Sequence, residues 1–67
     1  MFYTQEHNTI NNREIWHYLI DTPIGKFHVI EYETKSKELS RFIIDGDNEK
    51  AEQKFLSICK GILTGKM

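Results

Sequence analysis

Residues 14–33 read EIWHYLIDTPIGKFHVIEYE, and this stretch decides the fold. Two runs rich in β-branched and aromatic residues flank a segment with proline and glycine, a pattern typical of a β-hairpin. Pro23 has a fixed negative φ, whereas a two-residue loop of the favoured hairpin types requires a positive φ at its first position. We therefore expect a three-residue loop, from Pro23 to Gly25, that pairs Thr22 with Lys26.

This register sorts the hairpin side chains onto two faces. The first predicted face carries Trp16, Tyr18, Ile20, His28, Ile30 and Tyr32. The second carries Ile15, His17, Leu19, Phe27, Val29, Glu31 and Glu33. A register shifted by one residue would mix Glu31 with Trp16 and Tyr18, which the polar pattern disfavours. The first face is therefore the one on which we expect a helix to pack.

The rest of the chain completes a small α+β fold. Residues 39–44 predict a third strand, and residues 48–63 predict a helix that begins after Asp47 and ends before Gly65. Its apolar stripe consists of Ala51, Phe55, Ile58, Cys59 and Ile62. We expect a three-stranded antiparallel β-meander followed by one C-terminal helix packed on one sheet face, β-β-β-α. Residues 13–67 form this single domain, and residues 1–12 are a polar N-terminal arm or a short edge strand.

Composition limits the classes of function. With 39% hydrophobic and 28% charged residues, the chain is typical of a globular domain and not of a disordered one. Residues 1–33 carry two basic and five acidic residues, and residues 34–67 carry seven basic and five acidic residues, a weaker basic bias than nucleic-acid binders show. The sequence contains neither a secretory signal pattern nor an apolar run of about 18 residues, so we expect a cytoplasmic protein outside the membrane.

The residue types used in catalysis and metal binding do not form a recognisable pattern. The three histidines lack the spacing of metal ligands, and His17 is more simply a cross-strand partner of Glu31. Cys59 cannot form an internal disulfide alone, and its place on the apolar stripe predicts a buried thiol with a raised pKa. Glu31 and Glu33 are expected to be a solvated rim. We therefore expect no catalytic residue, no metal and no cofactor.

One local similarity concerns the hairpin alone. DTPIGKFHVIEYE, residues 21–33, resembles the first hairpin of DNA alkyltransferases of the methylguanine-repair type, in which a similar Pro-Ile/Leu-Gly turn joins two strands. The reactive Pro-Cys-His-Arg sequence of that family is absent, because Cys59 stands in Ser-Ile-Cys-Lys. The resemblance implies a hairpin and carries no activity over to this chain.

A single helix can cover only one side of the sheet, which leaves the second predicted face without a partner. The candidate interface on that face consists of Ile15, His17, Leu19, Phe27, Val29 and Glu31. An apolar centre with a polar rim is typical of an interface, although residues 1–12 or solvent are alternative occupants. We expect a small non-catalytic interaction module, a homodimer or the ligand of another protein, that inhibits or adapts a macromolecule in the style of phage or mobile-element accessory proteins, by analogy only. The alternative is a nucleic-acid binder that uses Trp16, Tyr18, Tyr32 and the C-terminal lysines.

Overall fold

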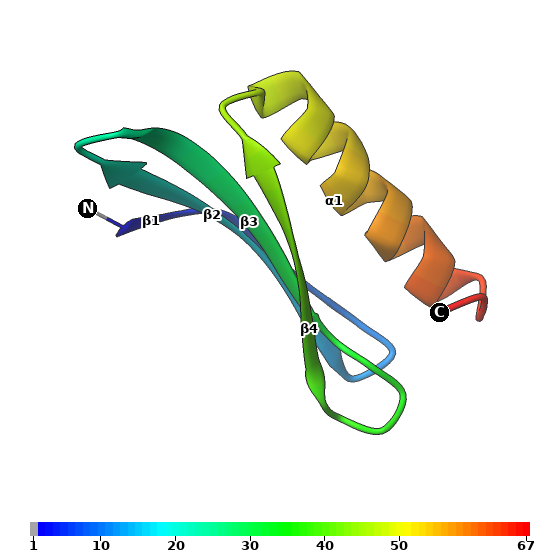
Figure 1. Ribbon diagram of the computed structural model, residues 1–67. Helices are drawn as coiled ribbons and strands as arrows, with labels where there is room; N and C mark the ends of the chain where they lie inside the picture. Colours follow the sequence, from blue (N-terminus) through cyan, green and yellow to red (C-terminus); the bar gives the residue numbers. More distant parts are fainter. Residues whose placement is uncertain (1) are drawn as a thin grey trace.

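The computed structural model describes residues 2–67. Within them lie five elements: β1 (Phe2–Ile10), β2 (Arg13–Thr22), β3 (Gly25–Glu33), β4 (Leu39–Asp45) and α1 (Asn48–Leu63). The strands form one antiparallel sheet in the order β1-β2-β3-β4, and α1 lies across one face of it (Figure 1). The α+β class and the C-terminal helix are confirmed, whereas the predicted count of three strands is wrong by one.

The additional strand is β1, at the edge of the sheet. Asn11 and Asn12 both adopt left-handed backbone conformations, with φ of 53° and 62°. Asparagine tolerates this conformation better than most residues, and two consecutive left-handed residues make the turn that suits the twist of a hairpin. β1 therefore folds back along β2 from Ile10 to Phe2, with one irregularity between Thr4 and Glu6.

The predicted register of the β2–β3 hairpin is wrong by one residue. Thr22 pairs with Gly25, so the loop has two residues, Pro23 and Ile24. Neither loop residue has a positive φ; Gly25 takes a φ of 146° instead, a conformation that glycine adopts without steric cost. The hydroxyl of Thr22 also donates to the Gly25 carbonyl at 2.7 Å. The objection to a two-residue loop at proline fails because the unusual backbone falls on the glycine after the loop.

Helix α1 begins and ends where the sequence predicts. The Asp47 side chain accepts a hydrogen bond from the Lys50 backbone N–H at 3.1 Å and so caps the helix N-terminus. The predicted stripe of five apolar residues is buried against the sheet. The core consists of Ile15, Ile30, Tyr32, Phe55, Ile58, Cys59 and Ile62.

The sheet thus has two unlike sides. The covered face, which meets α1, carries Arg13, Ile15, His17 and Leu19 of β2 with His28, Ile30 and Tyr32 of β3. The open face carries Glu14, Trp16, Tyr18 and Ile20 of β2 with Phe27, Val29, Glu31 and Glu33 of β3. Pairing extends the open face to Phe2, Thr4, His7 and Thr9 of β1 and to Leu39, Arg41, Ile43 and Asp45 of β4.

Candidate functional site

The six residues of the predicted interface do not share one face. Ile15 and His17 are buried beneath α1, with exposed fractions of 0% and 1%, and Leu19 lies on the same covered face. The other three lie on the open face: Phe27, Val29 and Glu31. The prediction assigned the side chains of β3 to the correct faces and those of β2 to the wrong ones, because a shift of one residue moves every side chain of a strand to the opposite face.

The open face has an apolar part that no described element covers. Seven large side chains fill the middle of this face and its end at the β2–β3 turn: Phe2, Trp16, Tyr18, Ile20, Phe27, Val29 and Ile43. Val29 is itself buried among its neighbours, whereas the other six are half-buried or exposed. Phe2 remains 59% exposed and Ile43 68% exposed. Large apolar side chains that gather on one exposed surface mark an interaction site more often than scattered ones do.

Four rings form a row across β1 and β2 on this face. Phe2 lies 4.7 Å from Tyr18, Tyr18 lies 6.4 Å from Trp16, and Trp16 lies 5.6 Å from His7, measured between ring centroids. The last two pairs are nearly parallel, with interplanar angles of 13° and 12°. Tyr32, the third ring of the predicted stacking platform, is instead buried in the core.

A hollow of about 360 Å³ lies beside this row. It is lined by Phe2, Tyr18, Ile20, Val29, Glu31, Arg41 and Ile43. The carboxylate of Glu31 is ion-paired with the Arg41 guanidinium at 3.0 Å. Burial, together with the neighbouring charge of Glu31, raises the pKa of the Tyr18 phenol. Tyr18 is therefore a hydrogen-bond donor at neutral pH, set in an apolar surface.

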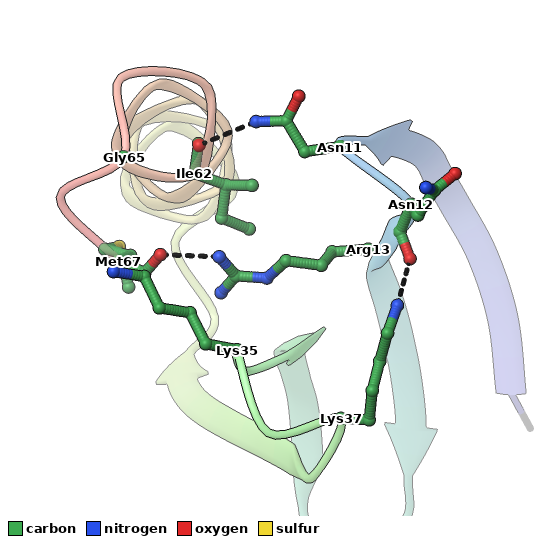
Figure 2. A pocket seen from close by; sticks show the side chains of 8 residues that line it. All are labelled: Asn11, Asn12, Arg13, Lys35, Lys37, Ile62, Gly65 and Met67. Carbon is green, nitrogen blue, oxygen red and sulfur yellow. Dashed lines mark hydrogen bonds between the residues drawn. The ribbon is translucent and has the colours of Figure 1, made fainter.

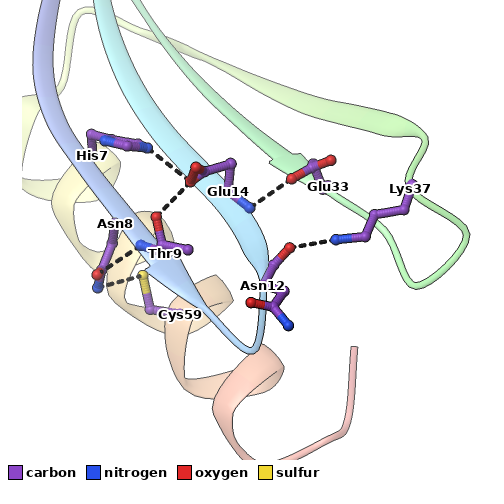
Figure 3. Close-up of polar contacts among 8 residues, drawn as sticks. All are labelled: His7, Asn8, Thr9, Asn12, Glu14, Glu33, Lys37 and Cys59. Atoms are coloured by element: carbon purple, nitrogen blue, oxygen red, sulfur yellow. Dashed lines mark hydrogen bonds and ion pairs between the residues drawn. The ribbon is translucent and has the colours of Figure 1, made fainter.

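The opposite end of the open face is acidic (Figure 3). His7 donates to the Glu14 carboxylate at 3.0 Å, and the Thr9 hydroxyl donates to the same oxygen. These hydrogen bonds, that of Thr9 first, lower the pKa of Glu14. Glu33 accepts from the Glu14 backbone N–H at 2.9 Å. The open face therefore carries most of its apolar side chains toward the β2–β3 turn, where Asp45 lies at the β4 edge, and it carries Glu14 and Glu33 near the β1–β2 turn.

The predicted pairing of His17 with Glu31 is wrong, because the two residues lie on opposite faces. His17 Nδ1 lies 3.1 Å from the Glu6 carboxylate, and His17 Nε2 lies 2.8 Å from His28 Nδ1. Since a carboxylate only accepts, Nδ1 of a neutral His17 carries the proton and Nε2 accepts from His28. Burial lowers the pKa of His28, and repulsion between the two imidazoles when both are protonated lowers it further.

The thiol of Cys59 lies in the core beside β1. Burial raises its pKa, and the Asn8 amide lies 4.0 Å from the sulfur (Figure 3). The expectation of a buried thiol with a raised pKa is confirmed. Among residues 2–67, no group of three or more His, Cys, Asp and Glu side chains is placed to hold a metal ion.

A basic pocket of about 400 Å³ lies where two turns meet the end of α1 (Figure 2). Arg13, Lys35 and Lys37 line it. The Arg13 guanidinium donates to the backbone oxygens of Glu33 and Met67, and Lys37 donates to the Asn12 carbonyl. Arg13 and Lys37 therefore connect the two turns and the end of α1, so a structural role accounts for these two cations.

The sequence contains weak signals for the residues that the prediction missed. Phe2, Arg41 and Ile43 belong to the open face through β1 and β4. Asn11-Asn12 is a recognisable hairpin turn, and it would have placed residues 2–10 beside β2. Within residues 2–67, no helix is both long and apolar enough to cross a membrane. Comparison of the chain with protein-family models, with curated proteins and with solved structures finds no match.

Proposed function

We propose that this chain is a small non-catalytic interaction module that binds another protein through the open face of its sheet. The observation that carries the proposal is the uncovered apolar part of this face, with Phe2 59% and Ile43 68% exposed. Charged side chains border it, with Glu14 and Glu33 toward one end and Asp45 toward the other. An apolar centre with a polar rim is the usual anatomy of a protein interface. By occupying a surface of its partner, such a module inhibits or adapts it.

The open face is a four-stranded surface whose strands are seven to ten residues long. The side chains are also held in place before binding, because cross-strand ring contacts and the Glu31–Arg41 pair restrict them. Such preorganisation lowers the entropy cost of association.

The charge distribution favours a different protein over a second copy on this face. When the strands of the two copies are aligned, a two-fold axis between two open faces runs either along the strands or across them. Along the strands, the acidic ends that carry Glu14 and Glu33 meet each other. Across the strands, the acidic end of one copy meets the apolar part of the other. The first arrangement opposes like charges, and the second places carboxylates against apolar side chains. Two open faces are therefore not complementary to each other in either arrangement.

The same charges describe the partner. A segment that fits this face presents apolar side chains to Tyr18 and Ile43, and lysine or arginine to Glu14 and Glu33. Electrostatic complementarity of this kind selects the partner and orients it along the strands.

Nucleic acid is the second candidate, because Trp16 and Tyr18 lie half-buried on the open face and aromatic rings on a sheet can stack with bases. The carboxylates of Glu14, Glu31 and Glu33 on the same face oppose it, since they repel phosphates. Arg41 is the one arginine or lysine that the described strands contribute to the open face, and it is paired with Glu31. Stacking without a basic groove supports protein binding better.

The proposal is tested by affinity capture from lysate of the cells that make this protein, with two matched variants. Tyr18→Glu places a charge in the apolar part of the open face. Leu56→Glu places the same charge on the outer surface of α1, where Leu56 is 63% exposed. We expect proteins that are retained by wild type and by Leu56→Glu to be lost with Tyr18→Glu. Equal retention by all three, with circular dichroism showing intact folds, would overturn the proposal.

A second measurement separates the nucleic-acid candidate. Trp16 is the only tryptophan, so its fluorescence reports on the open face. Single-stranded oligonucleotides should leave the emission unchanged at low salt. Quenching that disappears steeply as salt is added would instead identify a nucleic-acid binder.

A further inference from the structure

The two edges of the sheet differ in how well they are protected. The β1 edge is interrupted by an irregularity between Thr4 and Glu6, and bulges of this kind discourage the addition of another strand. β4 pairs with β3 without a break from Leu39 to Asp45. No proline interrupts it, and Leu39 and Ile43 remain 57% and 68% exposed. The β4 edge therefore has the features that favour strand addition.

The hydrogen-bond pattern shows which backbone groups of β4 face this edge. In a two-residue hairpin the pair that flanks the loop, Thr22 and Gly25, exchanges both hydrogen bonds, and such pairs then alternate along the strands. The even-numbered residues of β3 consequently bond to β4, in line with the bond from the Gly46 N–H to the Lys26 carbonyl at 3.0 Å. The β4 residues left with outward backbone groups are Leu39, Arg41, Ile43 and Asp45.

We propose that a second copy of this chain pairs with this edge, β4 against β4 and antiparallel, with Ile43 opposite Ile43 of the other copy. The two four-stranded sheets then become one. This inference does not rest on the proposed function, because it concerns an edge of the sheet and not its open face.

The side chains select this register over its neighbours. Outward-facing residues must pair with outward-facing residues, so the two-fold axis can pass at Arg41, Phe42 or Ile43. At Arg41, two guanidinium groups oppose each other, which is destabilising. At Phe42, Arg41 faces Ile43 and Leu39 faces Asp45, which pairs each charge with an apolar side chain.

The axis at Ile43 matches every pair that lies within β4, and Leu39 extends beyond this contact. On the open side, Arg41 lies opposite Asp45 of the other copy in both halves of the contact, and both side chains are exposed. On the helix side, Phe42 lies opposite Ile44, an aromatic and a β-branched residue that stabilise each other across strands. Phe42 is already held in position by the Tyr32 ring at 6.1 Å and by the Lys54 ammonium at 4.0 Å.

Such pairing also determines on which side of the joined sheet the helices and the open faces of the two copies lie. Its two-fold axis is perpendicular to the sheet, so both helices lie on one side and both open faces on the other. The dimer would present one continuous open surface of twice the area.

The test is the molar mass of the full chain by sedimentation across a dilution series, with two matched proline variants. Ile43→Pro removes an outward N–H and leaves the bonds to β3 intact. Phe42→Pro removes an inward N–H and should disrupt the sheet itself. We expect a wild-type dimer, a folded monomer for Ile43→Pro, and loss of fold for Phe42→Pro. A monomeric wild type, or a dimer that survives Ile43→Pro, overturns the proposal.

Charge variants test the register. Arg41→Asp and Asp45→Arg each place like charges opposite one another, so each should weaken its own dimer by about tenfold or more. Mixed together, the two variants have opposite charges in both pairs and should form a hetero-dimer at the wild-type concentration. A mixture that stays monomeric, beside a dimeric wild type, overturns this register. A dimer sensitive to Tyr18→Glu but not to Ile43→Pro would place self-association on the open face and contradict both proposals.

Discussion

The two faces of the sheet differ in whether their polar side chains are buried or in contact with solvent. On the covered face, His17 and Arg13 are removed from water, with exposed fractions of 1% and 7%, and each has hydrogen-bond partners. No buried side-chain nitrogen or oxygen of residues 2–67 lacks a partner. On the open face, Glu14 and Arg41 keep their contact with solvent. Helix α1 therefore packs where buried polar groups are satisfied, and not on the row with the largest rings.

The largest expected difference between the two faces is the loss of stability caused by a cavity under the helix. Ile30 is fully buried on the covered face, and Ile20 is half-buried on the open face. We expect Ile30→Ala to lower the free energy of unfolding by about 2–5 kcal/mol, because the helix cannot collapse fully into the space. Ile20→Ala should cost only about 1 kcal/mol, since less apolar area leaves water at this site.

Urea unfolding followed by circular dichroism measures both values. For a chain of 67 residues the larger loss is a substantial part of the total stability. Equal costs at the two positions would mean that both faces are equally buried in solution, as an open-face dimer would require.

As the pH is lowered, we expect protonation of His28 on the covered face to reduce stability at a higher pH than protonation of Glu14 on the open face. The folded-state pKa of His28 lies below its ordinary value of 6.5, because burial disfavours the charged imidazole. As the pH falls through 6.5, His28 is therefore protonated in the unfolded chain but not yet in the folded chain. This contribution to stability is fully present above pH 6.5 and is lost as the pH falls, by about 1.4 kcal/mol per pH unit, until folded His28 is protonated.

Urea titrations between pH 5 and pH 8 measure this slope, and His28→Leu should flatten it. Glu14 on the open face acts in a separate window. Its pKa is lowered from 4.5 by the hydrogen bonds of Thr9 and His7, so its contribution is present above pH 4.5 and is lost only below it. An unchanged slope in His28→Leu would assign the acid sensitivity to another group.

The helix and the strand positions could be predicted from local sequence, whereas the register of the hairpin, and with it the face on which each side chain lies, could not. Asp47 and the stripe from Ala51 to Ile62 are local signals, and they predict α1 correctly. The register failed because the fixed φ of Pro23 argued against a two-residue loop and because the pattern treats Glu31 beside Trp16 as unfavourable. The structure makes that arrangement acceptable with Arg41, a residue of β4 that lies 3.0 Å from Glu31. A charge partner ten residues away in sequence is not visible in the hairpin itself.

The buried histidines teach the same lesson. His17 alone looks like a solvent-facing residue, since a buried imidazole without partners is costly. Glu6 from β1 and His28 from β3 supply those partners at 3.1 and 2.8 Å. Neither contact follows from periodicity, because each depends on a register that must be known first. The open face was misassigned for this reason, and with it the interface residues on β2.

The next effect concerns the helix that makes the two faces different. Asp47→Ala should lower stability by about 1 kcal/mol, because the Lys50 N–H loses its acceptor at the helix N-terminus. Asp47→Asn is the matched control, since asparagine caps helices about as well as aspartate. Thermal unfolding of both variants at neutral pH measures the difference. If the asparagine variant is as unstable as the alanine variant, the charge of Asp47 matters more than its hydrogen bond.

The smallest effect belongs to the ion pair on the open face. Arg41 is 62% exposed and Glu31 is 16% exposed at the side chain, so water and salt screen much of their attraction. A double-mutant cycle with Arg41→Gln and Glu31→Gln should give a coupling free energy of about 0.5 kcal/mol that declines in high salt. The cycle is measured at a protein concentration at which the chain is monomeric, because Arg41 also lies at the proposed β4 contact. A coupling several times larger that resists salt would mean that the pair is buried, and hence that the open face is covered even in the isolated chain. Its partner would then have to be sought within the chain's own residues, and the distinction between a covered and an open face would no longer hold.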